Sequence, residues 1–169
     1  TQKLERLVER LLELAKADYL DVNKEELINP AVSLNAINNQ YRYRTLSITI
    51  PEGDWTINMS EEVFENIIID VIDNAYQHGG ENTKVEIELS IPQTDPNFAR
   101  ILVSDDGNGI SPGNSVKIFQ HFFTTGKGIE NSGLGLSIVR ALLRKHGGSI
   151  VLLPSATGAH FQIDIPLAS

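Results

Sequence analysis

Residues 60–80 read SEEVFENIIIDVIDNAYQHGG, and this stretch decides the fold because it joins a long apolar helix to a polar stripe. Ser60 and the two acidic residues after it favour a helix start, since Ser caps free N–H groups and carboxylates suit the positive end of the helix dipole. The apolar residues that follow predict a helix to about His78, ended by Gly79 and Gly80.

Three polar residues interrupt this helix at a spacing of four: Asp70, Asn74 and His78, with Gln77 beside them. At that spacing the side chains project from one stripe of the helix. The stripe is either a solvated face or a functional site, and the spacing alone leaves both open. An Asn carbonyl oxygen suits a hydrated Mg²⁺ that also binds phosphates.

The sequence after this helix predicts strands and one further helix. Apolar residues alternate over 85–91 and 161–165, and the short apolar runs at 101–104 and 150–153 predict two more strands. Residues 134–146 form a helical pattern that ends at two glycines. Helices on one side and mostly antiparallel strands on the other predict an α+β fold, a two-layer α/β sandwich with a mixed, mostly antiparallel sheet.

The sequence before this helix divides near residue 20, which gives units of 1–20 and 21–169. Leu4, Leu7, Leu11 and Leu14 recur at helical spacing, so the first unit is a core-facing amphipathic helix or the tail of a helical bundle. Asn23 and Glu26 resemble a capping box, which predicts a second helix to about residue 43 with a kink at Pro30. Residues 46–50 predict a strand, 51–54 a turn, and Trp55 with Ile57 a short return strand.

Two glycine-bearing segments are candidates for ligand binding. Residues 105–110, DDGNGI, form either a strand-ending turn or a site in which a carboxylate accepts a hydrogen bond from an exocyclic amine beside glycines. Residues 132–136, SGLGL, open a helix whose free N–H groups suit phosphate. Between them, the adjacent Phe122 and Phe123 in a Gly-rich loop suggest a hinged lid. Thr124, Thr125 and Lys127 follow in the same loop, and Lys127 taken alone is better explained as a solvated lysine than as a phosphate contact.

Composition excludes several classes of protein. The 169 residues suit one domain, and a net charge of −8 argues against broad nucleic-acid binding. The chain has no cysteine, so disulfides, thiolate metal sites and thiol nucleophiles are excluded. No apolar run approaches the length of a membrane span, and the chain begins within a helical pattern, so we expect a piece of a longer protein without membrane contact of its own.

Taken in order, these segments resemble the catalytic ATP-binding domain of sensor histidine kinases, in the superfamily of gyrase, Hsp90 and MutL. Residues 70–78 (DVIDNAYQH) resemble its N box, 105–110 its G1 box, 118–125 (IFQHFFTT) its F box and 132–138 (SGLGLSI) its G2 box. The resemblance covers roughly residues 21–167 and implies the Bergerat-type ATP-binding fold. The F box favours the histidine kinase branch.

The resemblance implies ATP and Mg²⁺ as cofactors, with Asn74 holding the metal and Asp105 binding the adenine amino group. The nucleotide contacts that it implies are Asn74, Gln77, His78, Asp105, Gly107, Gly109, Ile110, Phe122, Thr124, Thr125, Lys127, Ser132, Gly133, Leu134, Gly135 and Leu136. Asp70 stands where the family usually has Asn. It would support the Mg²⁺ site, which we favour, or act as a weak general base on water.

The resemblance also implies partners that this chain does not contain. None of the four histidines is followed by an acidic residue, so the phosphoacceptor is expected on a helical bundle upstream, with relay to a response regulator. The domain would be cytoplasmic, in a parent protein that can be membrane-anchored. Gln77, Asn131 and Asp70 depart from the family pattern. They keep open the alternative of a non-catalytic regulatory module. A gyrase-type ATPase is the other alternative, and the F box and the short lid argue against it.

Overall fold

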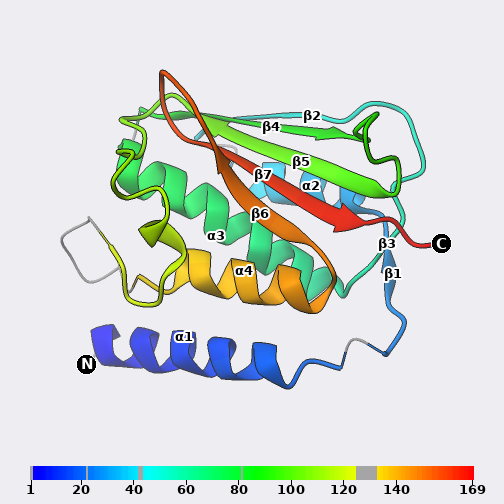
Figure 1. Ribbon diagram of the computed structural model, residues 1–169, viewed down its shortest axis with the longest axis horizontal. Coiled ribbons are helices and arrows are strands. Elements are labelled where there is room, and N and C mark those ends of the chain that lie inside the picture. Colours follow the sequence, from blue (N-terminus) through cyan, green and yellow to red (C-terminus); the bar gives the residue numbers. More distant parts are fainter. Residues whose placement is uncertain (1, 22, 42–43, 81, 125–132) are drawn as a thin grey trace.

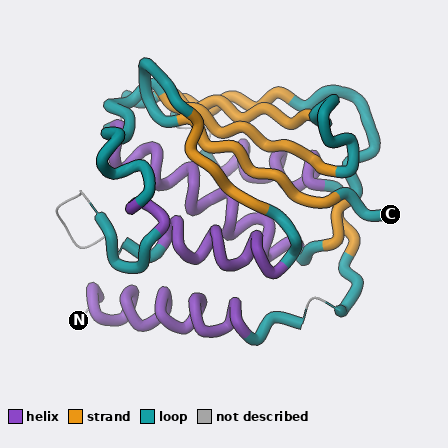
Figure 2. Tube along the Cα trace, viewed as in Figure 1, coloured by secondary structure: helices purple, strands orange, loops and turns teal. Residues whose placement is uncertain are grey.

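A five-stranded sheet, covered by helices on one face, forms the frame of the molecule in the computed structural model (Figures 1 and 2). The structure describes residues 2–21, 23–41, 44–80, 82–124 and 133–169. In chain order the elements are α1 (Gln2–Asp18), β1 (Leu27–Ile28), α2 (Pro30–Gln40), β2 (Thr45–Thr49), β3 (Ile57–Asn58), α3 (Glu61–Gly79), β4 (Lys84–Ser90), β5 (Phe98–Asp105), the 3₁₀ turn η1 (Lys117–Phe119), α4 (Gly135–Lys145), β6 (Ser149–Leu153) and β7 (His160–Pro166).

The strand order of the main sheet is β2-β4-β5-β7-β6. β2 runs parallel to β4, and every other neighbouring pair is antiparallel. The prediction of a two-layer α+β fold with a mixed, mostly antiparallel sheet is therefore confirmed. Along β4 and β7 buried and more exposed residues alternate, because a sheet with helices on one face buries only every second side chain.

The core lies between α3 and the sheet. Phe64, Ile67, Ile68 and Ile72 of α3 are fully buried, and they face strands that bury their own apolar residues. The Oγ of Ser60 accepts a hydrogen bond from the N–H of Val63, so the helix begins where the sequence predicted. This packing fixes α3 along the sheet and so fixes the polar residues near its end.

α1 packs against α4 at the edge of the domain (Figure 1). Its half-buried Leu7 and Leu14 contact the core, and the Nζ of Lys145 donates to the carbonyl oxygen of Asp18 at 3.1 Å. Four further apolar residues of α1 stay exposed: Leu4, Val8, Leu11 and Leu12. The helix thus buries one apolar stripe against the domain and leaves the other uncovered in this chain. Among the described residues, no helix is long and apolar enough to cross a bilayer.

The prediction that the second helix begins at Asn23 was wrong. Residues Leu27–Ile28 form β1 instead, and α2 begins at Pro30 with Asn29 as its cap. Proline suits the first helical position because its φ is fixed and its missing N–H has no helical partner there, so Pro30 begins the helix rather than kinking it. The N–H of Glu26 donates to the Oδ1 of Asn58 at 2.9 Å, which draws this segment to β3.

The predicted return strand near Trp55 does not pair with β2. β3 pairs with β1 in a separate two-stranded sheet, while β2 pairs with β4. Trp55 is only 4% exposed, and its Nε1 donates to the carbonyl oxygen of Pro51 at 3.3 Å. Burying this indole turns the chain away from β2, so the local turn pattern did not determine the pairing.

Candidate functional site

A cavity of about 450 Å³ opens between the end of α3, the loop after β5 and the turn between β6 and β7. Its walls combine polar side chains, glycines and a few apolar side chains, as expected of a small-molecule site. The lining residues are Asn74, Ala75, His78, Gly79, Asp105, Asn108, Gly109, Ile110, Ser111, Asn114, Ile118, Phe123, Thr124, Leu136, Ser155, Ala156, Gly158 and Ala159.

Asp105, the last residue of β5, is held in one orientation within this cavity. Its Oδ1 accepts hydrogen bonds from the N–H of Gly107 at 2.9 Å and of Ala159 at 3.2 Å. Its backbone N–H donates to the carbonyl oxygen of Ala159 at 3.0 Å, so β7 fixes the backbone as well. Oδ2 has no partner among the described residues. The carboxylate therefore presents one free acceptor oxygen to the cavity.

Glycine is required where the β6–β7 turn crosses Asp105. A Cβ on Gly158 would lie 1.7 Å from the carbonyl oxygen of Asp105, and the φ of Gly158 is +65°. Gly109 has a φ of +74°, and a Cβ there would lie 2.9 Å from the carbonyl oxygen of Gly158. Side chains at either position would push these loops apart and open the floor of the cavity.

Asn74 and His78 lie one turn apart near the end of α3, and both line the cavity. The side-chain amide of Asn74 has no hydrogen-bond partner among the described residues. An amide oxygen without a protein partner is available to a hydrated cation or a bound ligand. The stripe predicted from the sequence therefore faces a cavity at these two residues.

A smaller cavity of about 70 Å³ adjoins the first near the beginning of α4. Its lining residues are Arg10, Asp70, Asp73, Asn74, Gln77, His78, Ile118, Phe123, Thr124, Gly133, Gly135 and Leu136. The two cavities share Asn74, His78, Ile118, Phe123, Thr124 and Leu136, so they form one continuous depression. Free N–H groups at the beginning of α4 give this end a positive potential.

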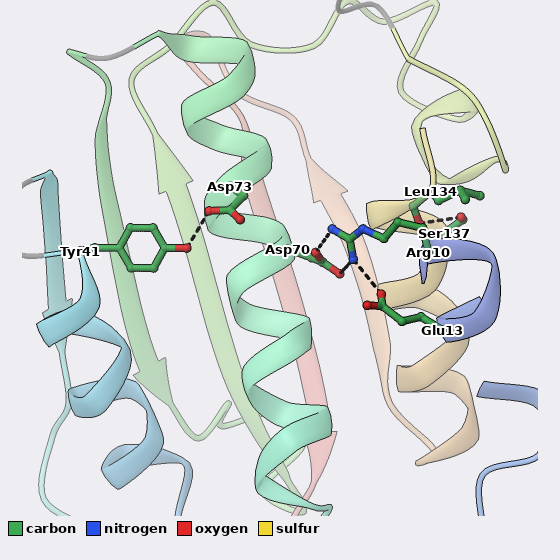
Figure 3. Close-up of polar contacts among 7 residues, drawn as sticks. All are labelled: Arg10, Glu13, Tyr41, Asp70, Asp73, Leu134 and Ser137. Carbon is green, nitrogen blue, oxygen red and sulfur yellow. Dashed lines mark hydrogen bonds and ion pairs between the residues drawn. The ribbon is translucent and has the colours of Figure 1, made fainter. Parts of the chain in front are cut away.

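Arg10 of α1 and Asp70 of α3 form a bidentate ion pair in the smaller cavity (Figure 3). Nη2 donates to Oδ1 at 2.6 Å and Nη1 to Oδ2 at 3.2 Å, while Nη1 also donates to Glu13 at 2.9 Å. Burial raises the pKa of Asp70 to about 6, although the guanidinium opposes this shift. The pKa of Arg10 is raised because its bonds to Asp70 outweigh its desolvation.

Asp73 points to the other side of α3, toward α2 (Figure 3). The phenol of Tyr41 donates to its Oδ1 at 2.6 Å, and the Tyr41 ring stacks on Tyr76 with 6.1 Å between the ring centroids. Burial and this hydrogen bond raise the pKa of Tyr41. The phenol oxygen of Tyr76 is buried without a hydrogen-bond partner among the residues that the structure describes, and burial raises its pKa too. This contact joins α2 to α3 behind the cavity.

The structure brings together most of the residues named from the sequence. The large cavity is lined by Asn74, His78, Asp105, Gly109, Ile110, Thr124 and Leu136. Gln77, Gly133, Gly135 and Asp70 line only the smaller one. Thr125, Lys127 and Ser132 lie outside the described residues, as does part of the predicted lid.

Three of the named residues do not line either cavity. Phe122 is 56% exposed with a φ of +63°, and Phe123 lines the cavity in its place. Leu134 is fully buried in the core, where its carbonyl oxygen accepts a hydrogen bond from Ser137 at 2.9 Å (Figure 3). Gly107 acts indirectly, because its N–H orients Asp105 and its α-carbon packs on Gly79.

Sequence reasoning missed two contributions to the site. The β6–β7 turn was identified only as a hairpin, yet Gly158 and Ala159 form the floor beneath Asp105. Arg10 was one charged residue on the polar face of a helix, and it lies 60 positions from its partner Asp70. The glycine in the turn was a usable signal for the first, whereas nothing in the local sequence signalled the second.

Fold and site together define a two-layer α/β domain with a small-molecule cavity beside the ends of α3 and β5. The profile described as "Histidine kinase-, DNA gyrase B-, and HSP90-like ATPase" matches residues 59–169, and the chain belongs to this family. Curated proteins that the chain is similar to include sensor histidine kinases and signal transduction histidine-protein kinases.

The sensor protein KdpD of Clostridium acetobutylicum is 32% identical over 98% of this chain and 19% of its own length. The sensor histidine kinase ZraS of Salmonella typhimurium is 31% identical over 98% of this chain and 36% of its own length. This chain therefore spans only about a fifth to a third of these two relatives. The solved structure of a mycobacterial sensor histidine kinase, MprB, is 26% identical with a TM-score of 0.69, covering 85% of this chain and 97% of that one.

Proposed function

We propose that this chain binds ATP with Mg²⁺ in the described cavity and serves as the catalytic domain of a protein histidine kinase. The observation that carries the proposal is Asp105, which lines the cavity: its Oδ1 is fixed by two backbone N–H groups, and its Oδ2 has no partner within the described part of the chain. A free carboxylate oxygen in that position accepts a hydrogen bond from the amino group of adenine. With adenine at Asp105, the phosphates of ATP would lie along Asn74 toward the beginning of α4.

The residues present fit a metal that enters with its nucleotide. The described ranges contain no group of three His, Cys, Asp or Glu side chains that could hold a metal alone. Mg²⁺ usually takes few protein ligands and completes its shell with phosphate oxygens and water. Asn74, with its unpartnered amide, would be the protein ligand. When bound, Mg²⁺ supplies charge neutralisation to the phosphates during phosphoryl transfer.

The acceptor of the γ-phosphate would lie on a helical bundle outside this chain. We propose that residues 1–20 form the end of a bundle helix and residues 21–169 the ATP-binding domain. The exposed apolar residues of α1, Leu4, Val8, Leu11 and Leu12, support this division, because the missing bundle would cover them. The solved structures of two histidine kinases, ThkA and ShkA, have a similar fold. ThkA was solved in complex with the response regulator protein TrrA. We propose a receiver domain as the next partner here, and a cytoplasmic location for the reaction.

One feature of the site favours a kinase over a gyrase-type ATPase. Water activation would need a carboxylate free to accept a proton, and Asp70 stands at the expected place. Both oxygens of Asp70 instead accept hydrogen bonds from Arg10. We propose that Asp70 is a positioning residue and that the isolated chain neither hydrolyses ATP at an appreciable rate nor phosphorylates itself.

Titration calorimetry with ADP and a non-hydrolysable ATP analogue, each with and without Mg²⁺, tests the proposed function. We expect binding of both nucleotides, with Mg²⁺ strengthening the binding of the triphosphate. Asp105→Asn keeps the shape of the side chain but can present a donor where the carboxylate accepts, so it should weaken the binding of both adenine nucleotides by about tenfold or more. A folded wild-type chain that binds neither nucleotide would contradict the proposal and favour a non-catalytic regulatory module.

A further inference from the structure

We propose that Arg10 of α1 is a phosphate-binding residue that contacts the terminal phosphate of a bound nucleoside triphosphate. The inference rests on the proposed function, since it assigns a phosphate ligand within the same site. It also gives α1 a role in nucleotide recognition, although this helix lies outside the unit expected to bind ATP.

Arg10 lies where the terminal phosphate of a bound triphosphate would reach. The adenine end of the site is fixed by Asp105 in the large cavity, and Asn74 lies at the boundary with the smaller one. A polyphosphate that extends from adenine past Asn74 enters the smaller cavity. Arg10 lines that cavity opposite Gly133 and Gly135 at the beginning of α4, so the terminal phosphate would lie between a guanidinium and free backbone N–H groups.

Two N–H donors of Arg10 remain available for a phosphate. A guanidinium has five N–H groups, and the described contacts use three of them: two to Asp70 and one to Glu13. The N–H of Nε and one N–H of Nη2 have no partner among the described residues. Because Asp70 holds the flat guanidinium by two bonds, the remaining donors are pre-oriented rather than mobile.

The charges that line the smaller cavity also favour Arg10 as the phosphate contact. Among the described lining residues of the smaller cavity, Arg10 is the only lysine or arginine, and Asp70 and Asp73 also line it. Gln77 contributes a neutral amide at the same place. α3 supplies no lysine or arginine to the described lining of this cavity, so Arg10 would neutralise part of the triphosphate charge together with a metal at Asn74. Figure 3 shows Arg10 reaching across from α1 to α3.

This geometry predicts selectivity between nucleotides. A diphosphate bound by its adenine at Asp105 would leave Arg10 uncontacted, whereas a triphosphate would gain one or two charge-assisted hydrogen bonds. Such bonds contribute on the order of tenfold or more in affinity. The triphosphate would also tie α1 to the domain, so α1 should be better protected from amide exchange with the ATP analogue than with ADP.

The test compares Arg10→Gln with wild type for ADP and the non-hydrolysable ATP analogue at fixed Mg²⁺, by titration calorimetry. We expect Arg10→Gln to lose about tenfold or more in affinity for the triphosphate and less than about threefold for ADP. Lys16→Gln removes the same charge from an exposed position on α1 and serves as the matched control, with both affinities unchanged. Arg10→Lys should recover part of the loss.

Arg10→Gln leaves Asp70 buried without its partner, which can destabilise the fold. The double variant Arg10→Gln/Asp70→Asn removes both charges, and it should show the same triphosphate-selective loss in a stable protein. Equal losses for both nucleotides, or no loss in either variant, would overturn the inference while leaving ATP binding established. A wild-type chain that binds neither nucleotide would remove the proposed function itself.

Discussion

The two ends of the site are built differently. The Asp105 end consists of main chain: β5, β7 and two tightly apposed turns hold one carboxylate through backbone N–H groups. The Arg10 end consists of long side chains from helices that are far apart in the sequence, joined by one ion pair. The first end is rigid before a ligand arrives, whereas the second can change with the position of α1. The site thus separates recognition of a base from recognition of phosphates.

The rigid end predicts the largest effect. Gly158→Ala would place a Cβ against the Asp105 carbonyl oxygen at a positive φ, so we expect a loss of more than about 3 kcal/mol in the free energy of unfolding. Gly135→Ala, at a position with open space around it, should change stability by less than about 1 kcal/mol. Urea unfolding measures both, and a Gly158→Ala protein as stable as wild type would show that the turn is not close-packed.

The ion-paired end predicts a dependence on pH. The pKa of Asp70 is about 6 in the fold against an ordinary 3.8, so between about pH 4 and 6 the folded chain binds a proton that the unfolded chain has lost. The contribution of Asp70 to the free energy of unfolding therefore falls as pH rises through this window, by on the order of 3 kcal/mol, and is constant above it.

Urea unfolding at several pH values, compared between wild type and Asp70→Asn, isolates this contribution. Arg10→Gln removes the guanidinium that lowers the pKa of Asp70, so the fall should extend to higher pH in that variant. A difference between wild type and Asp70→Asn that stays constant from pH 4 to 7 would contradict the assigned direction.

Asn74, which lies between the two ends of the site, predicts a smaller effect, on the dependence of triphosphate binding on Mg²⁺. Asn74→Ala removes the unpartnered amide, so the gain in triphosphate affinity on adding Mg²⁺ should shrink by about tenfold. Binding of ADP without Mg²⁺ should change little, because its adenine contacts Asp105. Calorimetry with and without the metal measures both quantities, and an unchanged Mg²⁺ dependence would move the metal ligand elsewhere.

The contact behind the cavity predicts the smallest effect. Tyr41→Phe removes the hydrogen bond to Asp73 but keeps the ring stacked on Tyr76, so the free energy of unfolding should fall by about 1 kcal/mol. Nucleotide affinity should not change, since Tyr41 lines neither cavity. A clear loss of affinity would show that Asp73 contributes to the phosphate end.

The sequence predicted best the parts of this molecule that depend on local periodicity. The helix from Ser60, the alternating strands of the sheet and the final hairpin were predictable because burial on one face imposes a period. The start of α2 was not, because Asn23 and Glu26 resemble a capping box, whereas the pairing of β1 with β3 holds this segment extended and the helix begins after Asn29.

The site divides in the same way. Asn74 and Asp105 were predictable because each stands in a short ordered motif, and the structure places both at one cavity. The role of Arg10 was not, because an arginine on a helix surface is ordinary until the fold brings it to Asp70. The exposed turn of Phe122 was also unpredictable, since its positive φ arises from packing of its backbone against Gly133.

The affinities of ADP and its inosine counterpart for wild type and Asp105→Asn test the central claim most directly. Inosine carries a carbonyl oxygen where adenosine has its amino group, so two acceptor oxygens would face each other at Asp105 with no proton between them. We predict that wild type prefers ADP by about 100-fold or more, and that Asp105→Asn, whose amide can donate, loses or reverses this preference. Equal affinities of wild type for the two nucleotides would contradict the assignment of Asp105 as the adenine-binding residue.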